Sequence, residues 1–248
     1  MNENHTQTAL ITGGASGIGA GVASLLHQRG FQVVIADIND EAGQALASEL
    51  GDQARYVSLD VTSESSWQAL MGQLDENVSV LVNNAGTGIS ASIEDTTLDD
   101  WQRIQDLNAR GVFLGCRFAV AAMKQTGGSI INIASALGKK ALSTTCAYSA
   151  SKAAVISLTE STALHCAEQS YPVRCNAVLP GFIDTPLLRN NLQLSEDPEG
   201  MLAGFVGLHP VNRLGTIEEV AETVAFLAGD QCSFITGASI SIDGAMTI

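Results

Sequence analysis

Short apolar segments alternate with longer helical ones along almost the whole chain. Segments of strand length lie at 8–12, 32–36, 55–59, 78–82, 129–133, 173–178 and 239–242. Between them, apolar residues recur at helical spacing in 17–29, 40–50, 64–74, 98–124, 147–169 and 217–228. Strands joined by crossover helices pair in parallel with right-handed connections. The alternation predicts an α/β fold, a doubly wound seven-stranded parallel sheet flanked by helices on both faces.

No composition shift divides the chain. Its 248 residues are 46% hydrophobic and 15% charged, as in a compact globular protein. Because no linker, repeat or charge block interrupts the pattern, we expect one domain over residues 1–248. Residues 186–215 form a long connection, rich in Asn, Leu and Gly, that breaks the strand–helix rhythm. Long connections of this kind often bind ligands, so we expect a substrate loop here.

The charge balance limits the classes of partner. With 12 Lys and Arg against 26 Asp and Glu, the net charge is -14, which repels nucleic acid and anionic lipid. The first seven residues lack the basic and apolar regions of a secretory signal, so we expect a cytoplasmic protein without membrane or nucleic-acid partners. The 5 cysteines form no CxxC pair and the 4 histidines are dispersed, so we expect free thiols and no metal site.

A glycine-rich turn follows the first predicted strand, with the spacing G-x-x-x-G-x-G. Glycines let the backbone turn sharply and approach a pyrophosphate, whose charge meets the free amides at the start of a helix. Glycines also serve ordinary turns, but the position at the first strand–helix junction favours the dinucleotide site of a Rossmann fold. The candidate contacts are Gly13, Ser16, Gly17, Ile18 and Gly19.

Asp37 follows the second predicted strand, where a carboxylate can accept hydrogen bonds from the adenosine ribose. A 2′-phosphate would meet repulsion there, and the neighbouring Ser16 and Ile38 carry no positive charge to hold one. This pattern predicts NAD as the cofactor in preference to NADP. The alternative is a turn or helix-capping carboxylate, since Asn39 and Asp40 open the next helix.

Tyr148 and Lys152 lie four residues apart at the start of a predicted helix, so their Cβ atoms are about 5–6 Å apart on one face. Reduction of a ketone requires a proton for the developing alkoxide, and the reverse reaction requires a base. A nearby ammonium favours the phenolate, so we expect Lys152 to lower the pKa of Tyr148. A Tyr–Lys pair at this spacing is common by chance and says little alone.

Together, these residues resemble the short-chain dehydrogenase/reductase superfamily. The resemblance extends from about Thr8 to Gly244 and rests on the glycine turn, the run Asn83–Gly86, Asn108, Ser135, Tyr148 with Lys152, and Pro180 with Gly181. It departs from the family mainly at Ala245, where many members carry a second glycine.

The resemblance implies roles for these positions. Asn108, Ser135, Tyr148 and Lys152 correspond to the catalytic set, in which Asn108 holds a water for proton relay and Ser135 hydrogen-bonds the substrate oxygen. Asp60 and Val61 correspond to the adenine contact, and Asn84 to a support of the adenosine ribose, within Asn84, Ala85 and Gly86. The implied nicotinamide contacts are Tyr148, Lys152, Pro180, Gly181, Ile183 and Thr185. Ser135 and Asn108 also have ordinary alternatives, as a turn residue and a helix-capping polar group.

An apolar substrate site is expected beside these groups. Its candidate walls are Ser135, Leu137, Cys146, Phe182, Leu187 and Leu188. Within the family, the chain is most similar to bacterial enzymes acting on hydroxysteroids and cyclic secondary alcohols. Lys139 and Lys140 leave open an anionic substrate such as an acyl-carrier thioester, although a solvated basic pair is the simpler interpretation.

We therefore expect an NAD(H)-dependent oxidoreductase that interconverts a small secondary alcohol and its ketone. The alternatives are a 3-oxoacyl thioester reductase, which the net charge disfavours, and a non-catalytic dinucleotide sensor, because a fold does not dictate function. The predicted helix that begins at Ala147 has apolar residues on more of its surface than the single stripe that packs against a core. These residues are Ala150, Ala153, Ala154, Val155, Ile156 and Leu158. This second apolar face predicts an isologous interface, and the resemblance implies a homotetramer.

Overall fold

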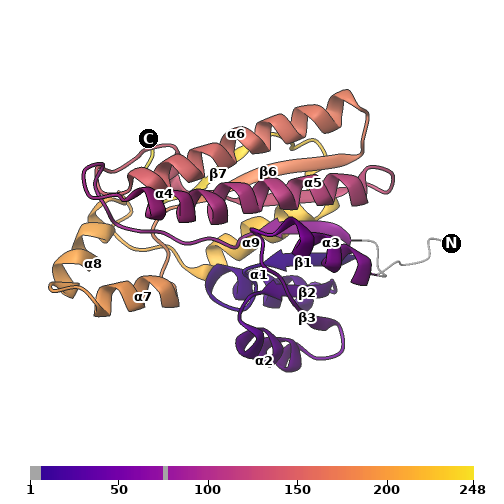
Figure 1. Cartoon of the computed structure of the whole chain (residues 1–248), viewed down its shortest axis with the longest axis horizontal. Coiled ribbons are helices and arrows are strands. Elements are labelled where there is room, and N and C mark those ends of the chain that lie inside the picture. Colours follow the sequence, from indigo (N-terminus) through magenta and orange to yellow (C-terminus); the bar gives the residue numbers. More distant parts are fainter. Residues whose placement is uncertain (1–6, 75–77) are drawn as a thin grey trace.

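Seven parallel strands form the centre of the molecule, in the order β3-β2-β1-β4-β5-β6-β7. The computed structural model describes residues 7–74 and 78–248 (Figure 1). The inner strands are almost wholly buried because helices cover both faces of the sheet. The strands are β1 Thr8–Thr12, β2 Gln32–Asp37, β3 Ala54–Ser58, β4 Val78–Asn83, β5 Gly128–Ile133, β6 Val173–Pro180 and β7 Ser239–Ile242. The seven predicted strands are confirmed, with ends that differ by up to two residues.

Two helical layers enclose this sheet. One core cluster joins the sheet to α3, α5 and α6, and the other joins it to α1, α2 and α9. The helices are α1 Gly17–Gln28, α2 Asp40–Leu50, α3 Glu64–Gln73, α4 Leu98–Gln105, α5 Gly111–Met123, α6 Cys146–Glu168, α7 Pro186–Gln193, α8 Pro198–Gly207 and α9 Ile217–Ala228. The predicted α/β fold with a doubly wound sheet is therefore confirmed, and it forms a single α/β domain.

The strand order reverses at β1, which pairs with β2 on one side and β4 on the other. The connections from these strands leave toward opposite faces of the sheet, which opens a crevice at their carboxyl ends. The glycine turn after β1 and the run Asn83–Gly86 after β4 therefore meet at this edge.

The predicted long helix at 98–124 is divided in the structure. Between α4 and α5, residues Asp106–Arg110 form a π-helical turn. A π-turn admits one extra residue per turn and is common at functional sites. Asn108 lies in this turn, so the interruption bears directly on the site.

The long connection at 186–215 contains two helices that we did not predict. The side chains of Thr185 and Asp197 cap α7 and α8, and a proline follows each cap at the first helical position. A capping residue followed by proline is a recognised start signal for a helix. The signal was therefore present in the sequence. The helices lie at one end of the molecule, beside the carboxyl edge of the sheet (Figure 1).

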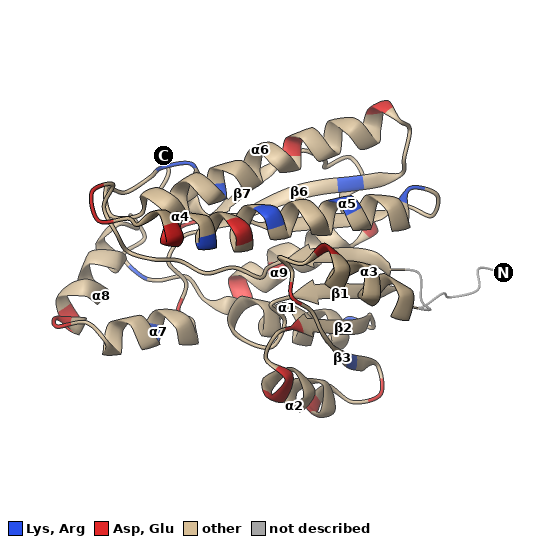
Figure 2. Cartoon of the chain, viewed as in Figure 1, with Lys and Arg blue, Asp and Glu red and all other residues tan. Residues whose placement is uncertain are grey.

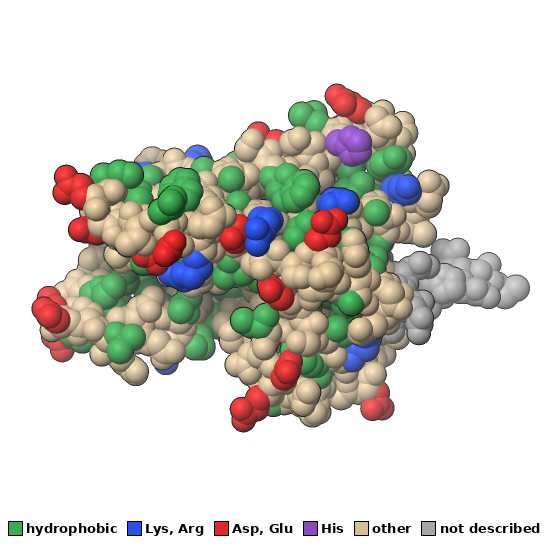
Figure 3. Space-filling view, in the orientation of Figure 1, with side chains coloured by type: hydrophobic (Ala, Val, Ile, Leu, Met, Phe, Trp, Pro, Cys, Tyr) green, Lys and Arg blue, Asp and Glu red, His purple; other side chains and the backbone are tan. Residues whose placement is uncertain are grey.

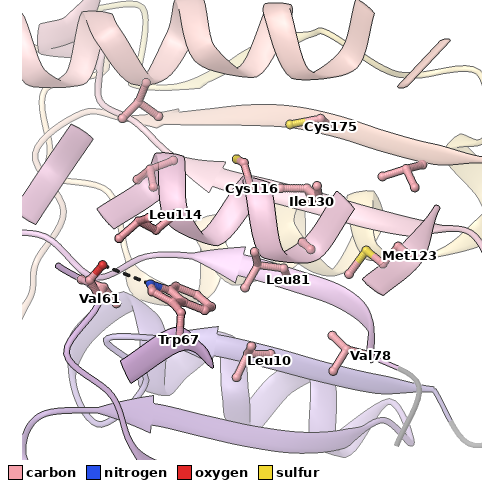
Figure 4. Packing of buried hydrophobic residues seen from close by; sticks show 14 of the residues in the cluster. Leu10, Val61, Trp67, Val78, Leu81, Leu114, Cys116, Met123, Ile130 and Cys175 are labelled. Carbon is pink, nitrogen blue, oxygen red and sulfur yellow. Dashed lines mark hydrogen bonds between the residues drawn. The ribbon is translucent and has the colours of Figure 1, made fainter. Parts of the chain in front are cut away.

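The hydrophobic core near β3 and β4 positions the loop that follows β3. Trp67 of α3 is fully buried and stacks on Phe118 of α5, with ring centroids 5.7 Å apart. Its indole Nε1 donates to the carbonyl of Val61 at 3.0 Å (Figure 4). This bond holds the loop after β3 against the core.

Charged residues are distributed over the surface without a basic stripe. Figure 2 shows the few basic residues spread over several elements of the described chain. Within residues 7–74 and 78–248, no helix combines the length and apolarity needed to cross a membrane. Across the same residues, no group of three His, Cys, Asp or Glu side chains could hold a metal ion. Residues 1–6, on which part of the expected cytoplasmic location rests, lie outside the described part.

Candidate functional site

The glycine turn is held open by its neighbours. Gly13 and Gly17 adopt φ angles of 60° and 54°, which L side chains rarely adopt. A Cβ on Gly19 would lie 2.1 Å from the carbonyl oxygen of Gly13, so the helix start packs directly on the turn. Asn84 braces the turn, since its Nδ2 donates to the carbonyls of Thr12 at 3.1 Å and Gly13 at 2.9 Å. These contacts leave a backbone cradle at the start of α1 that fits a dinucleotide phosphate.

Asp37 reaches this turn from the end of β2. One carboxylate oxygen accepts from the amide of Ala15 at 3.0 Å, and the other accepts from the amide of Asn39 at 3.0 Å. Asn39, not Asp37, caps α2. The carboxylate thus stands beside the glycine turn and also stabilises its own turn, which agrees with part of both interpretations.

The loop after β3 presents Asp60 and Val61 differently. Asp60 is exposed, and its Oδ1 accepts from the amide and the hydroxyl of Thr62 at 2.9 and 2.7 Å. Val61 is buried, and a Cβ on Gly111 would lie 3.0 Å from its Cγ2. The side chain of Val61 therefore packs inward against α5.

Ser135, Tyr148 and Lys152 lie together beyond the carboxyl end of β5. Lys152 is 4% exposed, and its Nζ donates to the carbonyl of Ile133 at 2.8 Å. The same Nζ lies 5.8 Å from the ring centroid of Tyr148. Ser135 is buried, and its hydroxyl accepts from the amide of Leu137 at 3.1 Å. A hydroxyl, a phenol and an ammonium thus share one buried corner.

Burial shifts the pKa values of Tyr148 and Lys152 in the directions that favour their neutral forms. Although part of the Tyr148 side chain remains open, desolvation raises its pKa, and a hydrogen bond with Ser135 partly offsets this rise. The net shift is therefore opposite to the lowering that we expected from Lys152, because its causes are desolvation and the hydrogen bond with Ser135. Burial also lowers the pKa of Lys152 to about 8. A lysine with a pKa near 8 can release its proton closer to neutral pH than an exposed lysine can.

Asn108 supports this corner from the π-helical turn. Its side chain is fully buried and pairs with the backbone of Thr87: Oδ1 accepts at 2.9 Å, and Nδ2 donates at 2.8 Å. Nδ2 also donates to Ser151 at 3.0 Å, whose hydroxyl donates to the carbonyl of Tyr148 at 2.7 Å. This chain of bonds joins the helix that carries Tyr148 to the loop after β4.

One cavity of about 430 Å³ joins the glycine turn to this corner. Its dinucleotide end contains the predicted residues Gly13, Ser16, Gly17, Ile18, Asn84, Ala85, Gly86, Pro180, Gly181, Ile183 and Thr185. Its other end contains the predicted residues Ser135, Leu137, Tyr148, Lys152, Phe182, Leu187 and Leu188. The structure thus brings together most of the predicted site residues around one space.

Six predicted site residues lie outside this lining: Gly19, Asp37, Asp60, Val61, Asn108 and Cys146. Cys146 faces away, since its Sγ lies 3.0 Å from the hydroxyl of Thr96. The lining also includes residues that we did not predict: Thr87, Gly88, Ile89, Ser90, Asn191 and Met246. Residues 87–90 directly follow the run Asn83–Gly86, which was their signal. Asn191 lies within the expected substrate loop at 186–215, which was its signal, whereas Met246 had none because its place depends on how the last residues fold back.

A glycine turn and a set of Ser, Tyr and Lys side chains that line one cavity define a class, the Rossmann-fold oxidoreductases. The family profile described as enoyl-(acyl carrier protein) reductase matches residues 13–247. With this match, the chain belongs to the short-chain dehydrogenase/reductase family. Members of this family are oxidoreductases that use a nicotinamide dinucleotide.

Characterised relatives cover nearly the full chain. A 3-beta-hydroxysteroid dehydrogenase of Comamonas testosteroni is 40% identical, over 99% of this chain and 97% of the relative. A trans-4-hydroxycyclohexanecarboxylate dehydrogenase of Sinomonas cyclohexanicum is 39% identical, over 97% of this chain and 93% of the relative. An NADP-dependent (R)-specific alcohol dehydrogenase of Lentilactobacillus kefiri is 37% identical, over 97% and 96%. The relatives thus differ in the substrates that their names give, and one of them is named as NADP-dependent.

Proposed function

We propose that this protein is an NAD(H)-dependent dehydrogenase that interconverts an apolar secondary alcohol, cyclic or steroidal, and its ketone. The observation that carries the proposal is the single cavity that contains both the glycine turn and Ser135, Tyr148 and Lys152. The named substrates of the hydroxysteroid and hydroxycyclohexane relatives support the alcohol class.

In this proposal, each buried polar group has one task. Bound NAD(H) supplies or accepts the hydride. Tyr148 passes the proton to or from the substrate oxygen, and Ser135 donates a hydrogen bond that holds this oxygen beside the phenol. As an ammonium, Lys152 attracts the negative charge that develops on the phenol oxygen during proton transfer, and its remaining donors orient the ribose. Asn108 keeps the backbone of its π-helical turn in place for a relay water.

The preference for NAD rests on charge. The Asp37 carboxylate lies 3.0 Å from the amide of Ala15 in the glycine turn. A 2′-phosphate placed there would face this carboxylate without a cation from Ser16 or Ile38. The NADP dependence of the Lentilactobacillus relative makes a direct comparison of the two cofactors necessary.

The substrate end of the cavity supports an uncharged, apolar substrate. Its lining includes Leu137, Leu142, Phe182, Met201 and Phe205, and Lys152 is the sole charged side chain among the described lining residues. Exposed Lys140 does not point freely into solvent, since its Nζ donates to the carbonyl of Met246 at 2.8 Å. This weakens the case for a thioester reductase that docks an acidic carrier.

A screen of steroid, cyclic and acyclic secondary alcohols, with NAD and NADP in parallel, tests the proposal through the absorbance of the reduced nicotinamide. We expect turnover of a cyclic or steroidal alcohol, with a higher kcat/KM for NAD. The Tyr148→Phe variant should bind NADH with an unchanged dissociation constant, measured by fluorescence titration. Its kcat should fall by a factor of about 10²–10⁴. Wild-type kcat in that variant would refute the proton role, and binding without any turnover would favour a dinucleotide sensor.

A further inference from the structure

His209 is a buried histidine outside the proton-transfer set. It follows α8 and is 3% exposed. Its Nε2 lies 3.1 Å from the amide nitrogen of Phe182, and its Nδ1 lies 2.8 Å from the carbonyl oxygen of Phe205. A backbone amide can only donate, so Nε2 must accept and the ring proton must be on Nδ1, which donates to Phe205. The two contacts together define a neutral imidazole with both nitrogens satisfied.

The imidazole joins two walls of the cavity. Phe182 follows β6, and Phe205 belongs to α8. Their rings stack with centroids 4.2 Å apart, and the imidazole meets the Phe182 ring edge-on at 5.9 Å. A Cβ on Gly181 would lie 2.5 Å from Nε2, so the chain after β6 fits closely around this ring. The imidazole thereby connects the end of α8 to the chain that leaves β6.

Both phenylalanines line the cavity, and Phe182 packs in the same apolar cluster as Tyr148 and Leu137. The position of the Phe182 ring therefore determines how much room a substrate has beside the phenol. Removal of the Nε2 acceptor would leave the amide of Phe182 without its partner, and an unsatisfied donor of this kind forces local movement.

We propose that neutral His209 is a positioning residue for the substrate: it ties α8 to the exit of β6 and so holds the Phe182–Phe205 wall beside Tyr148. This inference rests on the proposed function. It predicts a larger effect on substrate binding than on dinucleotide binding, because the rings that His209 holds, Phe182 and Phe205, line the substrate end of the cavity.

The test compares two replacements of His209. His209→Leu removes the acceptor, whereas His209→Gln places an amide oxygen near the former Nε2 position. We expect His209→Leu to raise the KM for a cyclic alcohol about tenfold, with the KM for NAD changed less than about twofold. His209→Gln should recover most of this loss. His165→Gln, on the exposed side of α6, is the matched control and should behave as wild type.

Hydrogen exchange of the Phe182 amide, followed by NMR, reads the contact directly. Protection of this amide should fall in His209→Leu and return in His209→Gln. A second variant, Phe205→Leu, removes the stacked ring but keeps the carbonyl that accepts from Nδ1. It should raise the KM for the alcohol while the Phe182 amide stays protected.

The outcomes separate this inference from the proposed function. A wild-type protein that oxidises no secondary alcohol contradicts the proposed function. Turnover by wild type together with an unchanged KM in folded His209→Leu overturns the role of His209 alone. If His209→Leu does not fold, Phe205→Leu decides: a raised KM supports the positioning of the wall, and an unchanged KM overturns it.

Discussion

At the scale of single residues, desolvation determines which form of each titratable group in the site is favoured. Desolvation disfavours the charged forms of Lys152 and Tyr148, so the pKa of the lysine falls to about 8 and the pKa of the phenol rises. Asp37 is instead only partly buried, and its carboxylate accepts from two backbone amides. Titratable groups are thus desolvated beside Ser135 and partly open to solvent beside the glycine turn.

Replacement of Lys152 should stabilise the protein while it abolishes activity. Because burial disfavours the ammonium, we expect Lys152→Met to raise the free energy of unfolding near neutral pH by about 1–3 kcal/mol. Folded wild type loses this proton near pH 8, whereas the unfolded chain keeps it until about pH 10.4. The unfolded state binds more protons between these values, so wild-type stability rises with pH there.

The advantage of Lys152→Met should therefore be largest below pH 8 and shrink as the pH rises toward about 10. Urea unfolding of both proteins across this range measures the difference. Arg103→Met, on an exposed side chain of α4, serves as the control for loss of a surface cation. A stability difference that does not vary with pH would show that Lys152 is not strained by burial.

Replacement of Asp37 should relax the choice of cofactor. We expect Asp37→Ser to lower the ratio of kcat/KM for NAD to that for NADP by at least about tenfold, equal to roughly 1.4 kcal/mol. The reason is the loss of a negative charge where the 2′-phosphate would lie. Asp52→Ser, an exposed acid between α2 and β3, is the control. An unchanged ratio in Asp37→Ser would remove this carboxylate from the ribose.

At the scale of secondary elements, close packing of helix on sheet places the polar groups. Gly115 lets α5 approach β4 so closely that a Cβ would lie 2.1 Å from Oδ1 of Asn83. Asn83 in turn donates to Asn132 of β5 at 2.8 Å. This buried pair locks the ends of the two strands that lead into Asn84 and Ser135.

Substitution of Gly115 should loosen this packing. We expect Gly115→Ala to lower the free energy of unfolding by about 1–3 kcal/mol, because overpacking outweighs the better helix propensity of alanine. Gly72→Ala in α3 is the control: its Cβ meets nothing within 4 Å, so stability should stay equal or rise by up to about 1 kcal/mol. Chemical unfolding compares the three proteins, and equal stability of Gly115→Ala and wild type would contradict the tight contact.

Element prediction from the sequence succeeded where local pattern and tertiary context agree. The β-branched runs of β1, β2 and β5 mark strands because they are buried on both faces. A Thr three residues before a Glu signals a capping box, and Thr216 and Glu219 form one at the start of α9. The π-helical turn was not, because Asp106–Arg110 has ordinary helix-forming residues. Its local widening accompanies the bonds of Asn108 to Thr87 and Ser151, which only tertiary contact creates.

At the scale of the whole molecule, one face exposes hydrophobic side chains among charged ones (Figure 3). Figure 3 shows exposed hydrophobic side chains over α4, α5 and α6. Trp101 of α4 and Phe113 of α5 are 38% and 47% exposed. On α6, Val155 is buried, whereas Ala150, Ala153 and Ala154 are exposed. These exposed hydrophobic residues on neighbouring helices support the predicted self-association.

We expect the protein to assemble into a tetramer in solution, with α6 in an isologous interface. Ala154→Arg should lower the assembly state measured by light scattering, because a long charged side chain separates closely packed helices. Ala45→Arg, at an exposed alanine of α2, should leave assembly unchanged. A wild-type monomer would contradict the prediction.

A cytoplasmic location also stays a prediction.

The sequence by itself determined the sheet and its parallel pairing, and it located the glycine turn and the residues that resemble the family's catalytic set. These features depend on local backbone needs and on repeated apolar patterns, which neighbouring residues express. Only the tertiary structure decided the direction of the Tyr148 pKa shift, the turning of Cys146 away from the cavity and the contact of His209 with Phe182. Each of these depends on groups that are far apart in the chain and become neighbours only when the helices close on the sheet.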